Sequence, residues 1–177
     1  MAKMILHRGQ AKRAWEIETY PCFQKFMLLD FDLYKFTSYL FVFDQVKAGK
    51  LFLDLGCGIG QDIRRLVHDG APSENLIGLG LRQAYVDLGN EMFQDESRLK
   101  STFLVQKSFI DTPKIMSLVK KFKVINSGYF MHMWSWERQV EVAKCMIHLL
   151  APEKGATITG VRFGSRSAGK WDAAQKW

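Results

Sequence analysis

The sequence predicts an α/β protein with a mostly parallel sheet flanked by helices. Short apolar segments alternate with helical ones between residues 51 and 161. The first apolar segment, 51–55, is nearly all-apolar, as strands buried inside parallel sheets are. A glycine-rich turn then joins it to a helix. Strand and helix in alternation favour a parallel sheet with crossover helices, and we expect one truncated after the fifth strand.

Composition fits a single globular domain of 177 residues, with 47% hydrophobic and 24% charged residues. The net charge is +7, but the basic residues are scattered, which argues against a nucleic-acid surface. Cys22, Cys57 and Cys145 form no zinc-ligand spacing. The sequence has neither a signal peptide nor a run near the roughly 20 apolar residues of a membrane span. We therefore expect a soluble cytoplasmic protein without metal.

Residues 1–50 are expected to form a helical arm or lid. A charged helix over 11–19 ends before Pro21, because a proline disfavours helix in the residue before it. A second helix over 38–48 ends at Gly49. Its inward-facing side chains are predicted to be Leu40, Phe41 and Phe43.

Residues 51–163 are expected to form the core. The predicted strands are 51–55, 76–79, 102–105, 124–126 and 157–161. The predicted helices are 61–68, 83–93, 113–121 and 135–150. Pro113 suits the first turn of the third helix, and Ser135 can cap the fourth. The tail, 164–177, is polar and is predicted to be disordered.

The loop after the first strand reads Asp54-Leu55-Gly56-Cys57-Gly58-Ile59-Gly60. Glycines there allow a tight turn and a close approach of a ligand to the backbone. A dinucleotide fingerprint would place its third glycine at position 61, which is Gln61. The GxGxG spacing, with Asp54 available for a ligand ammonium, suits a nucleoside that carries an amino acid better than a pyrophosphate.

Residues 51–60 resemble motif I of the class I S-adenosylmethionine-dependent methyltransferases, which have a Rossmann-like fold. A wider stretch, about 20–170, is similar to fungal methyltransferases of meroterpenoid biosynthesis, which methylate a carboxyl group on a terpenoid precursor. The similar words include Tyr20-Pro21, 60–62, 69–76, 81–83, Ser127-Gly128, Phe130, His132 and the stretch 139–144.

The resemblance implies S-adenosylmethionine as cofactor and a small apolar carboxylic acid of terpenoid type as substrate. It implies a cofactor site made of Asp54, Gly56, Cys57, Gly58, Gly60, Gly80, Leu81, Arg82, Lys107 and Ser108. Tyr129 and His132 follow the fourth strand, on the substrate side, and are the candidate catalytic residues. A carboxylate acceptor is already ionised at neutral pH, so its methylation needs no general base.

Two positions depart from the family pattern. The acid that ends the second strand and binds the ribose hydroxyls is replaced by Gly80, and an acid after the third strand is replaced by Lys107. Loss of one such charged contact costs roughly 1.5–3 kcal/mol, or about tenfold to a hundredfold in affinity.

Three functions therefore stay open. The first is O-methylation of a carboxyl group. The second is a degenerate methyltransferase-like protein without cofactor binding, and the third is an NADP-dependent reductase in which Arg82 receives a 2′-phosphate. A sheet that ends at its fifth strand would also leave an open edge, which predicts a homodimer.

Overall fold

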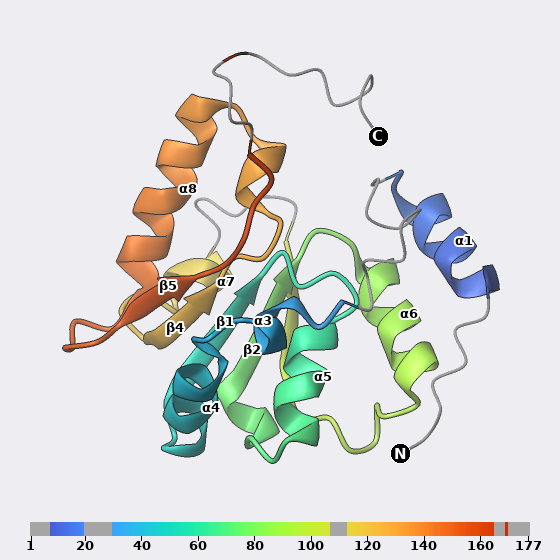
Figure 1. The fold of residues 1–177 in the computed structure, drawn as a ribbon, viewed down its shortest axis with the longest axis horizontal. Helices are drawn as coiled ribbons and strands as arrows, with labels where there is room; N and C mark the ends of the chain where they lie inside the picture. The colour runs from blue at the N-terminus through green and yellow to red at the C-terminus, as the bar shows by residue number, and fades with distance from the viewer. Residues whose placement is uncertain (1–7, 20–29, 107–112, 165–168, 170–177) are drawn as a thin grey trace.

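The computed structural model describes residues 8–19, 30–106, 113–164 and 169. Its centre is a sheet of five strands in the order β3-β2-β1-β4-β5 (Figure 1). Every neighbouring pair is parallel. The strands are β1 (Leu51–Leu55), β2 (Leu76–Gly80), β3 (Thr102–Val105), β4 (Phe122–Asn126) and β5 (Thr157–Thr159). The predicted α/β fold with a parallel sheet is confirmed.

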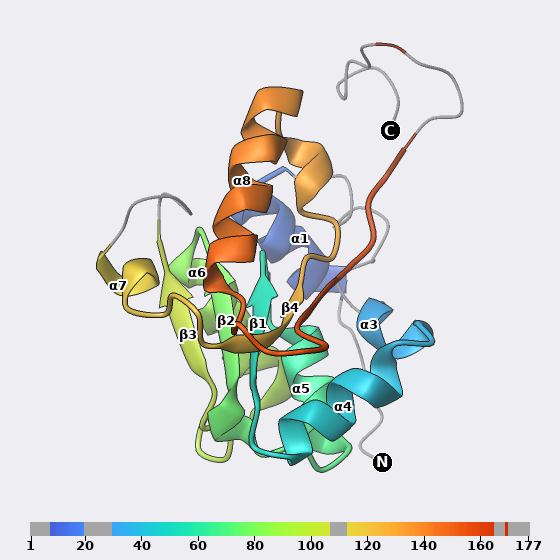
Figure 2. The same ribbon diagram turned by 90° about the vertical axis from the view of Figure 1, so that its left-hand side faces the viewer.

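The helices cover both faces of this sheet. They are α1 (Arg8–Ile17), α3 (Asp32–Lys35), α4 (Tyr39–Lys47), α5 (Gln61–His68), α6 (Gln83–Phe93), α7 (Pro113–Met116) and α8 (Trp136–Leu149), with short 3₁₀ turns at Ser73–Asn75 and Met131–Met133. Helices α4 and α5 lie on one side of the sheet and α8 lies on the other (Figures 1 and 2). No helix of the described segments is long and apolar enough to cross a membrane.

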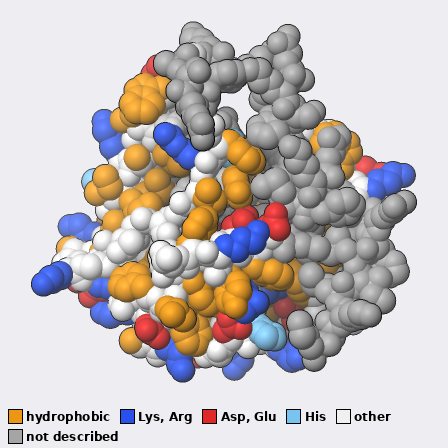
Figure 3. Space-filling model, viewed as in Figure 1, with side chains coloured by type: hydrophobic (Ala, Val, Ile, Leu, Met, Phe, Trp, Pro, Cys, Tyr) orange, Lys and Arg blue, Asp and Glu red, His pale blue; other side chains and the backbone are white. Residues whose placement is uncertain are grey.

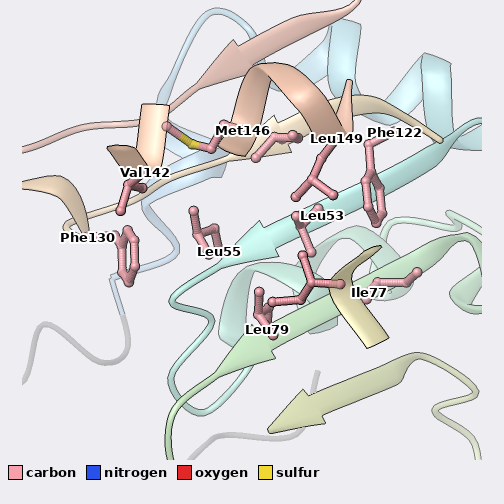
Figure 4. Packing of buried hydrophobic residues seen from close by; sticks show 11 residues of the cluster. Leu53, Leu55, Ile77, Leu79, Phe122, Phe130, Val142, Met146 and Leu149 are labelled. Carbon is pink, nitrogen blue, oxygen red and sulfur yellow. The ribbon is translucent and has the colours of Figure 1, made fainter. Parts of the chain in front are cut away.

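Alternating side chains of β1 divide the core between these two faces, as strand geometry requires. Leu53 and Leu55 join a cluster under α8, which contributes Val142, Met146 and Leu149 (Figure 4). Phe52 points to the opposite face and packs with side chains of α4 and α5. The sheet is therefore buried on both sides, which explains why its strands are nearly all-apolar.

The predicted inner face of α4 is wrong. Leu40 and Phe41 are 69% and 39% exposed, and Phe43 packs only partly against the core. The buried side chains are instead Tyr39, Val42 and Val46. The hydroxyl of Tyr39 donates to Asp69 Oδ2 over 2.6 Å at the end of α5, and this contact turns the Tyr39 side of the helix inward.

The helix predicted over 113–121 is shorter than expected and ends at Met116. Lys120 has a positive φ of +59°. The N–H groups of Lys120 and Lys121 donate to the carbonyls of His148 and Leu149 at the end of α8. These hydrogen bonds to α8 take the place of the last turn of the predicted helix. Strand β4 therefore begins at Phe122, two residues earlier than predicted.

Several predicted features lie outside the described residues. They are the Tyr20-Pro21 entry segment, Lys107, Ser108 and nearly all of the predicted tail 164–177.

Arg64 of α5 is a buried cation that ties four parts of the chain together. Its side chain is 4% exposed, and its guanidinium lies over the rings of Phe93 and Phe103 at 4.9 and 5.6 Å. Its donors reach Ile59 O at 2.5 Å, Asn90 Oδ1 at 2.7 Å and Asp95 Oδ2 at 2.9 Å. One side chain therefore joins the glycine loop to α6, to the segment after α6 and to β3.

We expect Arg64→Met to destabilise the fold by about 3 kcal/mol, because it leaves the half-buried carboxylate of Asp95 and the buried carbonyl of Ile59 without their donors. Urea unfolding measures the change. The matched control is Arg138→Met on α8, whose partly exposed pair with Glu141 should be worth less than about 1 kcal/mol. Equal losses in the two variants would contradict the structural role of Arg64.

Candidate functional site

The candidate site lies where β1, β2 and β4 end, at the carboxyl edge at which open parallel sheets bind ligands. The glycine loop, residues 56–60, begins there. The N–H groups of Gly56 and Cys57 both donate to the carbonyl of Leu79, over 2.8 and 3.2 Å. The loop is thereby anchored to the end of β2 before α5 begins.

The three loop glycines all have positive φ, but they meet different surroundings. A Cβ on Gly56 would lie 2.7 Å from the ring of Phe130, and one on Gly60 would lie 2.8 Å from the ring of Phe103. These two glycines are therefore required by packing within the protein. At Gly58, with φ +53°, a Cβ would meet no atom of the described residues within 4 Å. Among the described residues, Gly58 is thus the loop glycine with open space in the direction of a side chain.

Asp54 is enclosed below this loop. The residue is 5% exposed, and its Oδ1 accepts a hydrogen bond of 2.9 Å from Asn126 Nδ2. Burial raises the pKa of Asp54 to about 6, partly offset by the bond from Asn126. Asp54, which is predicted to bind a ligand ammonium, thus joins the end of β1 to the end of β4. One of its two oxygens is bound to Asn126.

Asp62, in the first turn of α5, forms a second buried carboxyl that the sequence analysis did not single out. It is 6% exposed and accepts from the N–H of Leu33 over 3.3 Å. Burial, followed by the nearby charge of Asp54, raises the pKa of Asp62 to about 8. Asp62 therefore keeps its proton to a higher pH than an ordinary aspartate does.

The end of β2 has room for a side chain. A Cβ on Gly80 would lie 3.5 Å from Cys57 Sγ, an ordinary contact, and Gly80 does not have a positive φ. Cys57 is 3% exposed, and burial raises the pKa of its thiol, so that the sulfur is an unreactive wall of this space. Two residues further on, Arg82 pairs with Glu18 over 2.7 Å.

The loop after β4 brings Tyr129 and His132, the two candidate catalytic residues, close to each other. Tyr129 has a φ of +48°, an uncommon conformation for a residue with a side chain. Its ring lies 6.2 Å from that of His132, and both rings contact Phe163, at 4.9 and 5.0 Å. The sequence analysis missed Phe163, because it follows a different strand.

Both candidate catalytic side chains are uncharged at neutral pH. Burial, then the nearby carboxylate of Asp32, raises the pKa of Tyr129. Burial, then the charge of Arg162, lowers the pKa of His132. This loop therefore offers a phenol and a neutral imidazole, which can donate hydrogen bonds without carrying charge.

Four buried polar side-chain atoms of the described residues have no hydrogen-bond partner. They are Gln61 Oε1, Ser127 Oγ, His132 Nδ1 and Trp134 Nε1. All four follow the ends of β1 and β4. Because buried polar groups in folded proteins are almost always paired, these atoms are free to bind water or a ligand.

The described residues contain no group of three or more His, Cys, Asp or Glu side chains that could hold a metal ion.

The raised pKa of Asp62 predicts a pH dependence of stability. The unfolded carboxyl loses its proton near pH 4, whereas the folded one keeps it up to about pH 8, so stability falls as pH rises between those values. We expect Asp62→Asn to flatten this pH dependence, because an amide does not titrate. The amide oxygen can still accept from the N–H of Leu33, so the substitution keeps the hydrogen bond.

Urea unfolding at pH values across this window measures the effect. The control is Asp87→Asn, an exposed position on α6, which should retain the parent's pH dependence. A parent protein with equal stability at both ends of the window would contradict the raised pKa.

The known proteins whose sequences resemble this chain are methyltransferases. No family model matches the chain. The chain is 37% identical over 160 residues to O-methyltransferase phiE of Fungal sp. (strain ATCC 74256), covering 89% of this chain and 53% of that protein. It is also 37% identical over 142 residues to the Asnovolin E/Chermesin D methyltransferase nvfJ of Aspergillus novofumigatus, covering 80% and 51%. The chain thus spans about half the length of these curated relatives.

Solved structures share the fold at low sequence identity. Magnesium protoporphyrin IX methyltransferase from Synechocystis PCC 6803, with bound SAH, aligns with a TM-score of 0.55 and 16% identity over 80% of this chain and 62% of its own. The 4+2 cyclase SpnF aligns with a TM-score of 0.56 and 17% identity over 77% and 48%. At these identities the likeness concerns the fold alone. Over most of its length the chain therefore resembles fungal O-methyltransferases, and it shares its fold with a solved methyltransferase.

Proposed function

We propose that this chain binds S-adenosylmethionine and forms the cofactor half of a small-molecule methyltransferase. The observation that carries the proposal is the open space at Gly58, inside a GxGxG loop that ends β1 and begins α5. The names of the curated relatives, which are methyltransferases, support it.

The described residues fit this cofactor. The methionine part would lie against Gly58 and the start of α5, where Gly60 provides no side-chain cap and the helix N–H groups can receive a carboxylate. The nucleoside would lie toward Gly80, Leu81 and Arg82. Of the described residues, Cys57 alone has an atom within 4 Å of where a Cβ on Gly80 would lie. Lys107 and Ser108, the other two residues predicted to bind the cofactor, lie outside the described residues.

The proposed acceptor is the carboxyl group of an apolar, terpenoid-type acid. Trp134 Nε1 can only donate a hydrogen bond, and Ser127 Oγ and His132 Nδ1 can donate as well, so these unpartnered atoms suit an acceptor such as a carboxylate. The rings of Tyr129 and Phe163 supply an apolar surface beside them. One relative is named as a methyltransferase of asnovolin E and chermesin D, which supports a small molecule as the acceptor.

The chemistry of the cofactor needs little from the protein beyond placement. Bound S-adenosylmethionine supplies a methyl group on a sulfonium, and its transfer to an ionised carboxylate gives a methyl ester and S-adenosylhomocysteine with no proton to remove. Neutral His132 and Tyr129 would hold the carboxylate in line while keeping water out. In this proposal they position the substrate and do not act as bases.

Two other functions are weaker. A 2′-phosphate of NADPH would have to displace Glu18 from Arg82, and the GxGxG spacing already favours a different ligand. The second alternative is a methyltransferase-like protein without cofactor binding. Gly80 favours it, because glycine lacks the carboxylate that would bind the ribose hydroxyls. Calorimetry with S-adenosylmethionine, S-adenosylhomocysteine and NADPH separates all three, and we expect the first two ligands to bind and the third not to bind.

Gly58→Val should abolish binding of S-adenosylmethionine in this titration. A branched side chain would fill the open space at the loop, and the positive φ adds backbone strain. The matched control is Gly49→Val, since Gly49 also has a positive φ (+84°) and open surroundings but lies at the other end of the sheet. It should show a comparable loss of stability with unchanged affinity. Parent-like affinity in Gly58→Val would remove this loop as the cofactor site.

We also propose that the chain forms a homodimer through β5 and the outer side of α8. Among the described strands β5 is the last at its edge of the sheet, and Trp136 and Ile147 of α8 are 69% and 63% exposed. Hydrophobic side chains gather along this side of the molecule (Figure 3). A second copy can pair edge to edge with β5 and cover the same apolar stripe by twofold symmetry.

Sedimentation of the purified chain at micromolar concentrations should show a dimer, and Ile147→Lys should shift it to monomer. Leu40→Lys, at an equally exposed position on α4, is the control that should stay dimeric. A parent that sediments as a monomer at tens of micromolar would contradict the proposed interface.

A further inference from the structure

The end of β2 lacks the acceptor that a ribonucleoside needs. In dinucleotide-binding sheets, an acidic side chain about 20 residues after the glycine loop accepts hydrogen bonds from the ribose hydroxyls. Here the last residue of β2 is Gly80, which offers no side chain. The space beside it is bounded by Cys57 Sγ at 3.5 Å from a hypothetical Cβ. A carboxylate that serves this place has to come from another element.

Helix α1 packs close to the end of β2. It lies along α6 (Figure 1), where Ala14 is fully buried and clusters with Ile59 of the glycine loop and with Tyr85 and Leu88 of α6. The hydroxyl of Tyr85 donates to the carbonyl of Ala14 over 3.3 Å. The C-terminal end of α1 is therefore held against both the glycine loop and the start of α6.

Glu18 follows α1 directly and reaches the residues that follow β2. Its Oε2 accepts from Arg82 Nη2 over 2.7 Å, and Arg82 comes two residues after Gly80 in extended conformation. The side chain of Glu18 is 34% exposed, so the carboxylate is accessible. A carboxylate has about four acceptor sites, and the one bond from Arg82 leaves others for ligand hydroxyls.

We propose that Glu18 supplies the carboxylate that binds the ribose diol of the cofactor, with Arg82 holding it in place of an acidic residue at the end of β2. The inference rests on the proposed binding of S-adenosylmethionine. It assigns α1 to the cofactor site and makes a free 2′,3′-diol part of what the protein recognises.

Calorimetry with S-adenosylhomocysteine and its 2′,3′-dideoxy analogue tests the proposal on the full chain. The parent should bind the natural ligand about tenfold or more tightly than the analogue, as expected for hydrogen bonds to a charged group. Glu18→Ala should weaken the natural ligand by a similar factor and leave the analogue unchanged. The control, Glu16→Ala on the same helix, should behave as the parent.

A second variant tests whether Glu18 stands in for a residue at position 80. Gly80→Asp has space for its Cβ, and in the Glu18→Ala background it should restore most of the lost affinity. Parent-like binding by Glu18→Ala, or an equal loss for both ligands, would overturn the role of Glu18 and leave the proposed function standing. A parent that binds neither ligand would overturn the proposed function and this inference together.

Discussion

The buried guanidinium of Arg64 is the interaction on which the site depends. It lies behind the glycine loop and binds the carbonyl of Ile59 while its other donors hold α6 and the segment that follows it. Close packing adds to this restraint, since a Cβ on Gly89 of α6 would lie 2.3 Å from Ile59 O. These contacts hold the glycine loop against α6. The open side of Gly58 faces away from that packing.

Charge is distributed unevenly across the site. Below the glycine loop, Asp54 and Asp62 are enclosed, and burial raises the pKa of both carboxyls. On the β4 side, Tyr129 and His132 are neutral and lie against the apolar ring of Phe163. In the proposed site, the cofactor side would therefore contain two carboxyl groups that burial makes harder to ionise, and the substrate side would offer uncharged donors and an aromatic surface.

The N-terminal segment is part of this site as well as a cover for the sheet. Helix α3 provides the N–H that reaches Asp62, and Asp32 lies close enough to influence the pKa of Tyr129. Helix α1 carries Glu18 to Arg82. These contacts join segments 8–19 and 30–39 to the loops that follow β1, β2 and β4.

The sequence by itself determined the alternation of strands and helices, the position of the glycine loop and the cap at Ser135, because these depend on local patterns of apolar residues, glycine and side-chain acceptors. It also located Tyr129 and His132 on one loop. The tertiary structure decided which face of α4 is buried, where α7 ends, and which glycine is free of packing. It also decided the pairings of Asp54 with Asn126, of Arg64 with Ile59 and of Glu18 with Arg82. The last three join residues whose contact depends on how separate elements pack, and local sequence pattern carries no signal of that packing.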